Sequence, residues 1–134
     1  MKSNAAAALG NRAHFTARPA FKEELIRCFA TVLQCGAPAT FAAPGIAEPI
    51  VAFRFPGGGS ISIEFTDDAL DEHDARRGAW LEIQTDDPVG LEKQILDAGL
   101  EKVEYTATTT FYFAAPGGQV FGVVDPRRLQ AEIR

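Results

Sequence analysis

The chain has 134 residues, of which 46% are hydrophobic and 23% are charged, as is ordinary for a globular protein. This length fits one domain and is enough to bury about two-thirds of the surface that the unfolded chain exposes. The net charge is −5, which argues against a nucleic-acid partner because phosphates call for a basic face. No apolar run approaches the ~20 residues that span a bilayer, so we expect no membrane segment.

The first eleven residues contain Lys2 and a short alanine stretch, too small and too weakly apolar for a secretory signal. We expect a disordered tail over residues 1–11 and a single domain over residues 12–134. Cys28 and Cys35 are seven residues apart on one predicted helix, and the rise of ~10 Å exceeds the reach of a disulfide. We therefore expect reduced thiols and a cytoplasmic protein.

Residues 12–66 predict a strand, a helix and three further strands. The first strand, 13–18, alternates apolar residues with His14, Thr16 and Arg18. The helix is expected over 19–35, with Pro19 in its first turn and Gly36 at its end. Its apolar stripe is Phe21, Leu25, Cys28, Phe29 and Val32. Residues 37–50 hold three prolines and the second strand. The others are expected at 50–55 and 60–65, joined by a glycine-rich turn at 56–59.

After a charged, solvated connector at 67–78, the same order of elements begins again and continues to about residue 126. A strand over 79–85 places Trp80, Glu82 and Gln84 on one face. Asp87 is a good N-cap for the next helix, Pro88 a good first residue and Gly99 a good stop; the buried stripe is Leu91, Ile95 and Ala98. Strands are expected at 103–106, 110–114 and 119–124, with a turn at 116–118.

The polar face of the first strand in each repeat decides the architecture. A strand buried on both sides would be apolar throughout, whereas His14, Thr16, Glu82 and Gln84 are polar. These residues must therefore face water, a cavity or a partner. The sequence predicts an α+β fold of two βαβββ repeats, forming cupped mixed sheets with helices outside and an open inner face.

This order of elements resembles the vicinal oxygen chelate superfamily, which includes glyoxalase I, fosfomycin-resistance proteins, extradiol dioxygenases and bleomycin-resistance proteins. The resemblance covers about residues 12–125. It is strongest at 79–87, at the helix end 97–99 and in 113–125, which is similar to the closing hairpin of the family, aromatic-x-D-P-D/G-G-x-x-hydrophobic-E. It implies a glyoxalase/bleomycin-resistance-like fold.

Metalloenzymes of this superfamily carry ligands on the first and last strands of each repeat. The resemblance places His14 and Glu64 at these positions in repeat one, but Trp80 and Gly122 in repeat two, and neither of the latter binds a metal through its side chain. Glu82 shares the face of Trp80, although no family ligand stands there. Two donors are fewer than the three or four of a catalytic metal site.

Several roles therefore stay open for these residues. His14 and Glu64 are candidate metal ligands, candidate catalytic residues, groups that bind an organic ligand, or hydrogen-bonded residues of a wet cavity; His14 would serve as a base or donor near neutral pH. Trp80 would stack on a planar or cationic ligand, fill space, or pack at a dimer interface. Gly122 leaves room for close approach.

The preferred hypothesis is a homodimeric, glyoxalase/bleomycin-resistance-like protein that binds a small organic molecule, aromatic or cationic, between its repeats without a tightly bound metal. The expected ligand-binding residues are Thr16, Ser62, Trp80, Glu82, Gln84 and Gly122. One alternative is a divalent-metal lyase, isomerase or dioxygenase with His14 and Glu64 as ligands and Glu82 or water completing the set. The other is a non-catalytic domain with a vestigial pocket.

Overall fold

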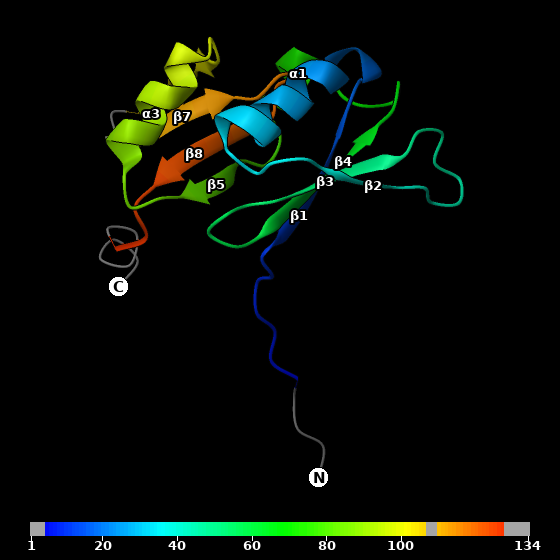
Figure 1. Cartoon of the computed structure of the whole chain (residues 1–134), viewed down its shortest axis with the longest axis horizontal. Helices are drawn as coiled ribbons and strands as arrows, with labels where there is room; N and C mark the ends of the chain where they lie inside the picture. The colour runs from blue at the N-terminus through cyan, green and yellow to red at the C-terminus, as the bar shows by residue number, and fades with distance from the viewer. Residues whose placement is uncertain (1–4, 107–109, 128–134) are drawn as a thin grey trace.

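The computed structural model describes residues 5–106 and 110–127, and it contains the predicted strand–helix–three-strand order twice (Figure 1). The elements of the first repeat are β1 Arg12–Ala17, η1 Pro19–Phe21, α1 Lys22–Arg27, η2 Cys28–Val32, β2 Ala39–Phe41, β3 Ile50–Arg54 and β4 Ser60–Phe65. The connector carries α2 Glu72–Ala75. The second repeat consists of β5 Leu81–Gln84, α3 Pro88–Asp97, β6 Glu101–Lys102, β7 Phe111–Ala114 and β8 Val120–Val124.

Each repeat builds one four-stranded mixed sheet, and the two sheets have equivalent strand orders. These are β1-β4-β3-β2 and β5-β8-β7-β6, with the first strand parallel to the last and the other neighbours antiparallel. Phe15 pairs with Ile63 in the first sheet, and Leu81 pairs with Phe121 in the second. The two-repeat α+β architecture with mixed sheets is therefore confirmed.

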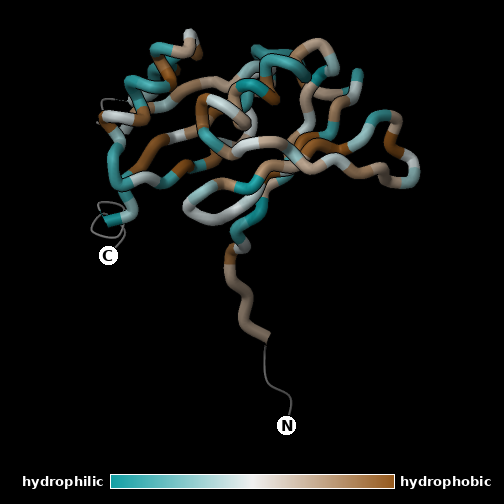
Figure 2. The backbone as a smooth tube through the Cα atoms, in the orientation of Figure 1, coloured by the Kyte–Doolittle hydropathy of each residue, from teal (hydrophilic) through white to brown (hydrophobic). Residues whose placement is uncertain are grey.

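The two sheets share one apolar core beneath the helices, centred on Phe29 of η2. Its side chain has no exposed surface, and its ring lies 5.4 Å from that of Phe53 in the first sheet and 5.8 Å from that of Phe121 in the second. Figure 1 shows α1 and α3 together on one side of the strands, and Figure 2 shows apolar stretches along the strands of both sheets. The opposite side of each sheet, hereafter its open face, carries the polar residues.

The first helix is shorter than predicted. It ends at Val32 with a π turn, in which Leu33 N–H donates to the Cys28 carbonyl at 2.9 Å, and the chain then turns at Gln34, whose φ is +61°. Cys35 therefore lies beyond the helix rather than on it. Both cysteines are free thiols, and burial raises the pKa of Cys28 to about 12 and that of Cys35 to about 11, so both stay protonated near neutral pH.

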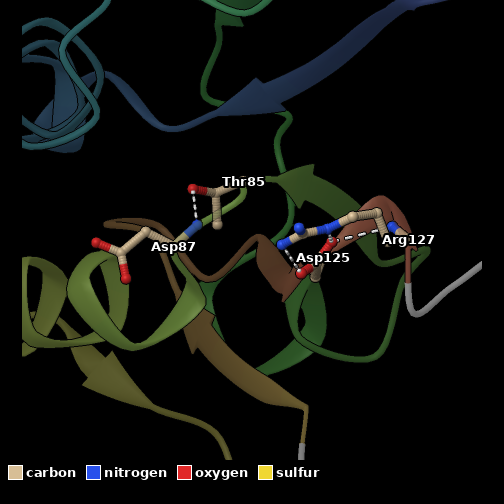
Figure 3. Close-up of polar contacts among 4 residues, drawn as sticks. All are labelled: Thr85, Asp87, Asp125 and Arg127. Atoms are coloured by element: carbon tan, nitrogen blue, oxygen red, sulfur yellow. Dashed lines mark hydrogen bonds and ion pairs between the residues drawn. The ribbon is translucent and has the colours of Figure 1, made fainter.

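The second helix begins and ends where the sequence predicts. Asp87 accepts a hydrogen bond from Gly90 N–H at 3.0 Å, Pro88 is the first residue, and Gly99 has a φ of +86° just past the end. Figure 3 shows Asp87 N–H donating to the Thr85 hydroxyl beside the Asp125–Arg127 ion pair. Thr85 N–H also donates to the Val124 carbonyl at 2.9 Å, and this bond holds the turn from β5 into α3 against the end of β8.

Two other predictions need correction. The strand expected at 103–106 lies earlier, at Glu101–Lys102, and Val103 N–H continues the pairing by donating to the Tyr112 carbonyl at 2.8 Å. Polar residues with little alternation gave no signal for this short edge strand. The connector, expected to be solvated, contains α2 and buries Ala69, whose carbonyl accepts a hydrogen bond from Arg18 at 2.9 Å.

The connector packs against the hairpin turn of the second repeat. A Cβ placed on Gly118 would lie 2.5 Å from the Glu72 carbonyl oxygen and 2.9 Å from the Ala75 Cβ, so only glycine allows α2 to approach this closely. The equivalent turn of the first repeat is uncovered, because a Cβ on Gly57 or Gly58 would meet nothing within 4 Å. The two repeats thus share a fold but differ in what covers their turns.

The structure describes only part of the tail expected over residues 1–11. Residues 5–10 belong to no helix or strand and are exposed, and Figure 1 shows this segment leading away from the sheets; residues 1–4 lie outside the described residues. Within residues 5–106 and 110–127, no helix combines the length and the hydropathy needed to cross a bilayer.

Candidate functional site

The open face of the first sheet brings together His14, Ser62 and Glu64, here called the polar cluster. His14 is on β1 and pairs in register with Ser62 on the neighbouring β4, where Glu64 stands two residues further along. His14 Nδ1 is hydrogen-bonded to Ser62 Oγ at 2.7 Å, and His14 Nε2 lies 3.8 Å from Glu64 Oε1. The side chains of His14 and Glu64 are 47% and 25% exposed, so a ligand can reach both.

Ser62 fixes the orientation of the imidazole and leaves Nε2 facing the Glu64 carboxylate. A hydrogen bond on one ring nitrogen sets the tautomer and aims the other nitrogen. The 3.8 Å between His14 Nε2 and Glu64 Oε1 is too long for a direct hydrogen bond. Both atoms therefore keep the capacity to hydrogen-bond to a ligand. The pair can accept a cationic or hydrogen-bonding group between its two polar atoms.

The donors of the polar cluster do not by themselves fit a catalytic metal ion. Such an ion takes three or more protein ligands, and no group of three His, Cys, Asp or Glu side chains suited to an ion occurs in the described part of the chain. Glu82, considered as a third ligand, lies on β5 of the other sheet. A metal at His14 and Glu64 would need its remaining ligands from water, from a bound molecule or from a second subunit.

The open face of the second sheet carries three rings in mutual contact, here called the aromatic cluster: Trp80, Tyr105 and Tyr112. The Trp80 ring lies 4.9 Å from that of Tyr105 and 5.1 Å from that of Tyr112, and the two tyrosine rings are 5.7 Å apart. Their interplanar angles of 71°, 52° and 80° are typical of edge-to-face and tilted contacts.

Gly122 makes room for the Tyr112 ring of this cluster. A Cβ on Gly122 would lie 2.9 Å from Cε1 of Tyr112, its partner in register on β7, so the tyrosine ring rests on the glycine backbone. The hairpins β3–β4 and β7–β8 have the same register at an offset of 60 residues, so Gly122 corresponds to Ser62. Because His14 pairs with Ser62 and Glu82 pairs with Gly122, the structure relates His14 to Glu82 rather than to Trp80, and it relates Gly122 to Ser62 rather than to Glu64. The Tyr112 ring therefore lies, in the second sheet, over the position that Ser62 holds in the first.

Arg76 of the connector links the two edges of the aromatic cluster. Its carbonyl accepts a hydrogen bond from Trp80 Nε1 at 2.8 Å. Its guanidinium forms a bidentate ion pair with the Glu101 carboxylate on β6. This ion pair holds the pKa of Glu101 below its ordinary value. Since β6 leads toward Tyr105, the connector fixes Trp80 directly and the tyrosine loop through its preceding strand.

The other expected ligand-binding residues lie on the open faces but outside both clusters. Thr16 pairs in register with Glu64, Glu82 with Gly122, and Gln84 with Val124; Thr16, Glu82 and Gln84 are exposed. Two hollows, of about 370 and 150 Å³, lie along the connector instead, lined in part by Glu72, Arg76 and Glu101.

Sequence reasoning missed Tyr105 and Arg76. Both faces of the strand that carries Tyr112 are aromatic, so the sequence does not decide which face is open; pairing with Gly122 in the structure puts Tyr112 on the open face. Tyr105 follows a strand that was misplaced, and Arg76 belongs to a connector that was expected to be solvated. Neither residue carried a periodic signal that would have placed it beside Trp80.

The polar cluster and the aromatic cluster belong to different sheets, and the described contact between the sheets runs through their core faces. Phe15 of β1 and Phe121 of β8 are 6.4 Å apart between ring centroids, and both also contact Phe29. The open faces are thus turned away from this shared core. This geometry leaves each cluster free to meet a ligand or a second molecule.

Comparison with solved structures places this architecture among known folds. The chain is similar to glyoxalase I from Leishmania major (TM-score 0.72, 8% identity, covering 95% of this chain and 93% of that one). It also matches a glyoxalase/bleomycin resistance protein/dioxygenase superfamily member from Sphaerobacter thermophilus (0.65, 14%, 89% and 98%) and a fosfomycin resistance protein from Listeria monocytogenes (0.62, 11%, 89% and 93%). No protein-family model and no curated protein matches the sequence.

The protein has the glyoxalase/bleomycin-resistance/dioxygenase fold, and the resemblance to the vicinal oxygen chelate superfamily is confirmed at the level of the fold. With identities of 8–14%, the shared property is the backbone architecture. One fold of this kind hosts many functions, so the chemistry has to be argued from the two clusters.

Proposed function

We propose that the protein binds a small organic molecule on its open faces, with a flat ring at the aromatic cluster and a cationic or hydrogen-bonding group at the polar cluster. The observation that carries this proposal is the Tyr112 ring lying over Gly122. The ring forms an apolar contact surface at the position where the resemblance would place a metal-binding side chain. Aromatic rings supply a large contact area for flat ligands and bind cations through their faces.

A homodimer fits this proposal because the two clusters lie on open faces that turn away from the shared core of one chain. A second copy would place the polar cluster of one subunit opposite the aromatic cluster of its partner. The ligand would then lie between subunits, contacted by Glu82 and Gln84 from one side and by Thr16 from the other. Sedimentation velocity of the ligand-bound protein shows whether the binding species is a dimer.

The proposal is tested by tryptophan fluorescence, since Trp80 is the single tryptophan of the chain. Titration with small aromatic amines is expected to change its emission in a saturable way. Glu64→Gln should then weaken binding about tenfold or more, because a hydrogen bond to a charged group contributes about 1.5–3 kcal/mol. Glu23→Gln, the same change at an exposed position on α1, is the matched control. Equal affinities of both variants would contradict a role for the polar cluster.

A divalent-metal enzyme is the second candidate, favoured by the orientation that Ser62 gives to His14. We expect such a protein, freshly purified and titrated anaerobically with Ni²⁺, Zn²⁺, Mn²⁺ or Fe²⁺, to hold near-stoichiometric metal. His14→Ala should abolish this binding, and Ser62→Ala should weaken it about 10–100-fold through loss of the orienting bond. Metal binding that survives in His14→Ala would exclude the polar cluster as its site.

A further inference from the structure

The three rings of the aromatic cluster are not held equally. Trp80 is anchored by the hydrogen bond from its Nε1 to the Arg76 carbonyl. Tyr112 is part of β7 and rests on Gly122. Tyr105 belongs to no helix or strand, and 63% of its surface is exposed, although its ring contacts both of the others. It is therefore the ring of the cluster that can leave with the least disturbance of the sheet.

The spacing of the rings leaves no slot for a ligand between them. A flat molecule between two parallel rings needs about 7 Å, twice the contact distance of about 3.5 Å. The observed centroid separations are 4.9, 5.1 and 5.7 Å, so the cluster is closed. A ligand ring can contact Trp80 and Tyr112 together in this corner only by taking the position that Tyr105 holds.

We propose that Tyr105 is a built-in plug that occupies the ring-binding site formed by Trp80 and Tyr112, and that a flat aromatic ring of about phenol size displaces it. This inference rests on the proposed function and specifies its ligand. The Tyr105 ring, 71° from the plane of Trp80 and 80° from that of Tyr112, shows the shape that this corner accepts. The ligand carries a single substituted benzene ring as the part that docks here.

The competition between plug and ligand has a measurable size. Two edge-to-face ring contacts together correspond to a factor of about 5–150 in an equilibrium constant. Binding of a phenol to the wild-type protein is reduced by this factor because Tyr105 must leave first. Removing the Tyr105 side chain is expected to abolish this loss, so the affinity for a free phenol should rise by the same factor.

The test uses p-cresol, which matches the Tyr105 side chain, with Trp80 emission as the signal. Tyr105→Ala should bind p-cresol at least fivefold more tightly than the wild type. Tyr105→Phe keeps the ring and should bind as weakly as the wild type. Cyclohexanol, similar in size but not flat, should show little gain in Tyr105→Ala. No gain for p-cresol, or an equal gain in Tyr105→Phe, would overturn the proposal.

A second readout needs no ligand. Loss of the plug should expose the Trp80 face, so Tyr105→Ala alone should emit at longer wavelength and be quenched more strongly by acrylamide than Tyr105→Phe. Unchanged quenching would also overturn the proposal. If Tyr105→Ala gains p-cresol binding while the wild type binds no organic molecule, the proposed function fails and the plug stands. If the wild type binds an aromatic amine but Tyr105→Ala gains no affinity for p-cresol, the proposed function stands and the plug proposal fails.

Discussion

Replacing Phe29 with alanine is expected to lower the free energy of unfolding by about 4 kcal/mol, since phenylalanine-to-alanine changes in cores cost about 3–5 kcal/mol. The Phe29 side chain is fully buried, and its ring lies 5.4–6.3 Å from those of Phe15, Phe53, Phe55 and Phe121. It contacts both sheets, so the cavity left by alanine would loosen the joint between the repeats. Urea denaturation followed by circular dichroism measures the loss.

Phe41→Ala is the matched control for this prediction. Phe41 lies on the edge strand β2 and is 49% exposed, so its truncation should cost less than about 1 kcal/mol. A cost for Phe29→Ala no greater than that of Phe41→Ala would show that the sheets are not joined through this ring.

Gly118→Ala is expected to destabilise the protein by about 3 kcal/mol and to disturb Trp80 at the same time. Gly118 has a φ of +107°, where a side chain costs about 1–3 kcal/mol of strain. In addition, the new Cβ would collide with the Glu72 carbonyl oxygen at 2.5 Å, and overpacking costs about 1–3 kcal/mol. The collision should push α2 off the turn and stretch the Trp80–Arg76 hydrogen bond.

Gly58→Ala separates these two effects. Gly58 lies in the equivalent turn of repeat one with a φ of +112°, but a Cβ there would meet nothing within 4 Å. It should therefore carry the backbone strain alone and leave Trp80 emission unchanged. The difference between the two variants measures how tightly the connector is docked. Equal stabilities and equal spectra would mean that α2 contributes nothing to the position of Trp80.

The repeated fold could be predicted from the sequence because its signals are local and redundant. Alternation in 60–65 set both ends of β4, and the Asp87–Pro88 start with Gly99 at the stop set α3. The errors arose where tertiary contacts replace local preference. Glu101 and Lys102 form a strand only because β7 supplies their hydrogen-bond partners. The first helix ends earlier than predicted, in a π turn at Cys28–Val32 that no capping residue in the sequence indicates.

The candidate site was predictable on the first sheet and only in part on the second. His14, Ser62 and Glu64 follow from strand alternation once β1 and β4 are neighbours, because residues with the same parity share a face. The partners of Trp80 come from a connector and from a loop, whose residues have no period. Their positions depend on packing between segments distant in the sequence, such as Ala75 against Gly118.

The uncovered turn of repeat one has a practical consequence for labelling the protein. Residues 56–58 are exposed, and open space surrounds Gly57 and Gly58, as at the loop tips where insertions succeed best. A short epitope or a surface-immobilisation tag inserted between these glycines would stand clear of the connector, β6 and Trp80. The corresponding insertion at Gly117–Gly118 would displace α2, so the near-identical turns are not interchangeable as attachment points.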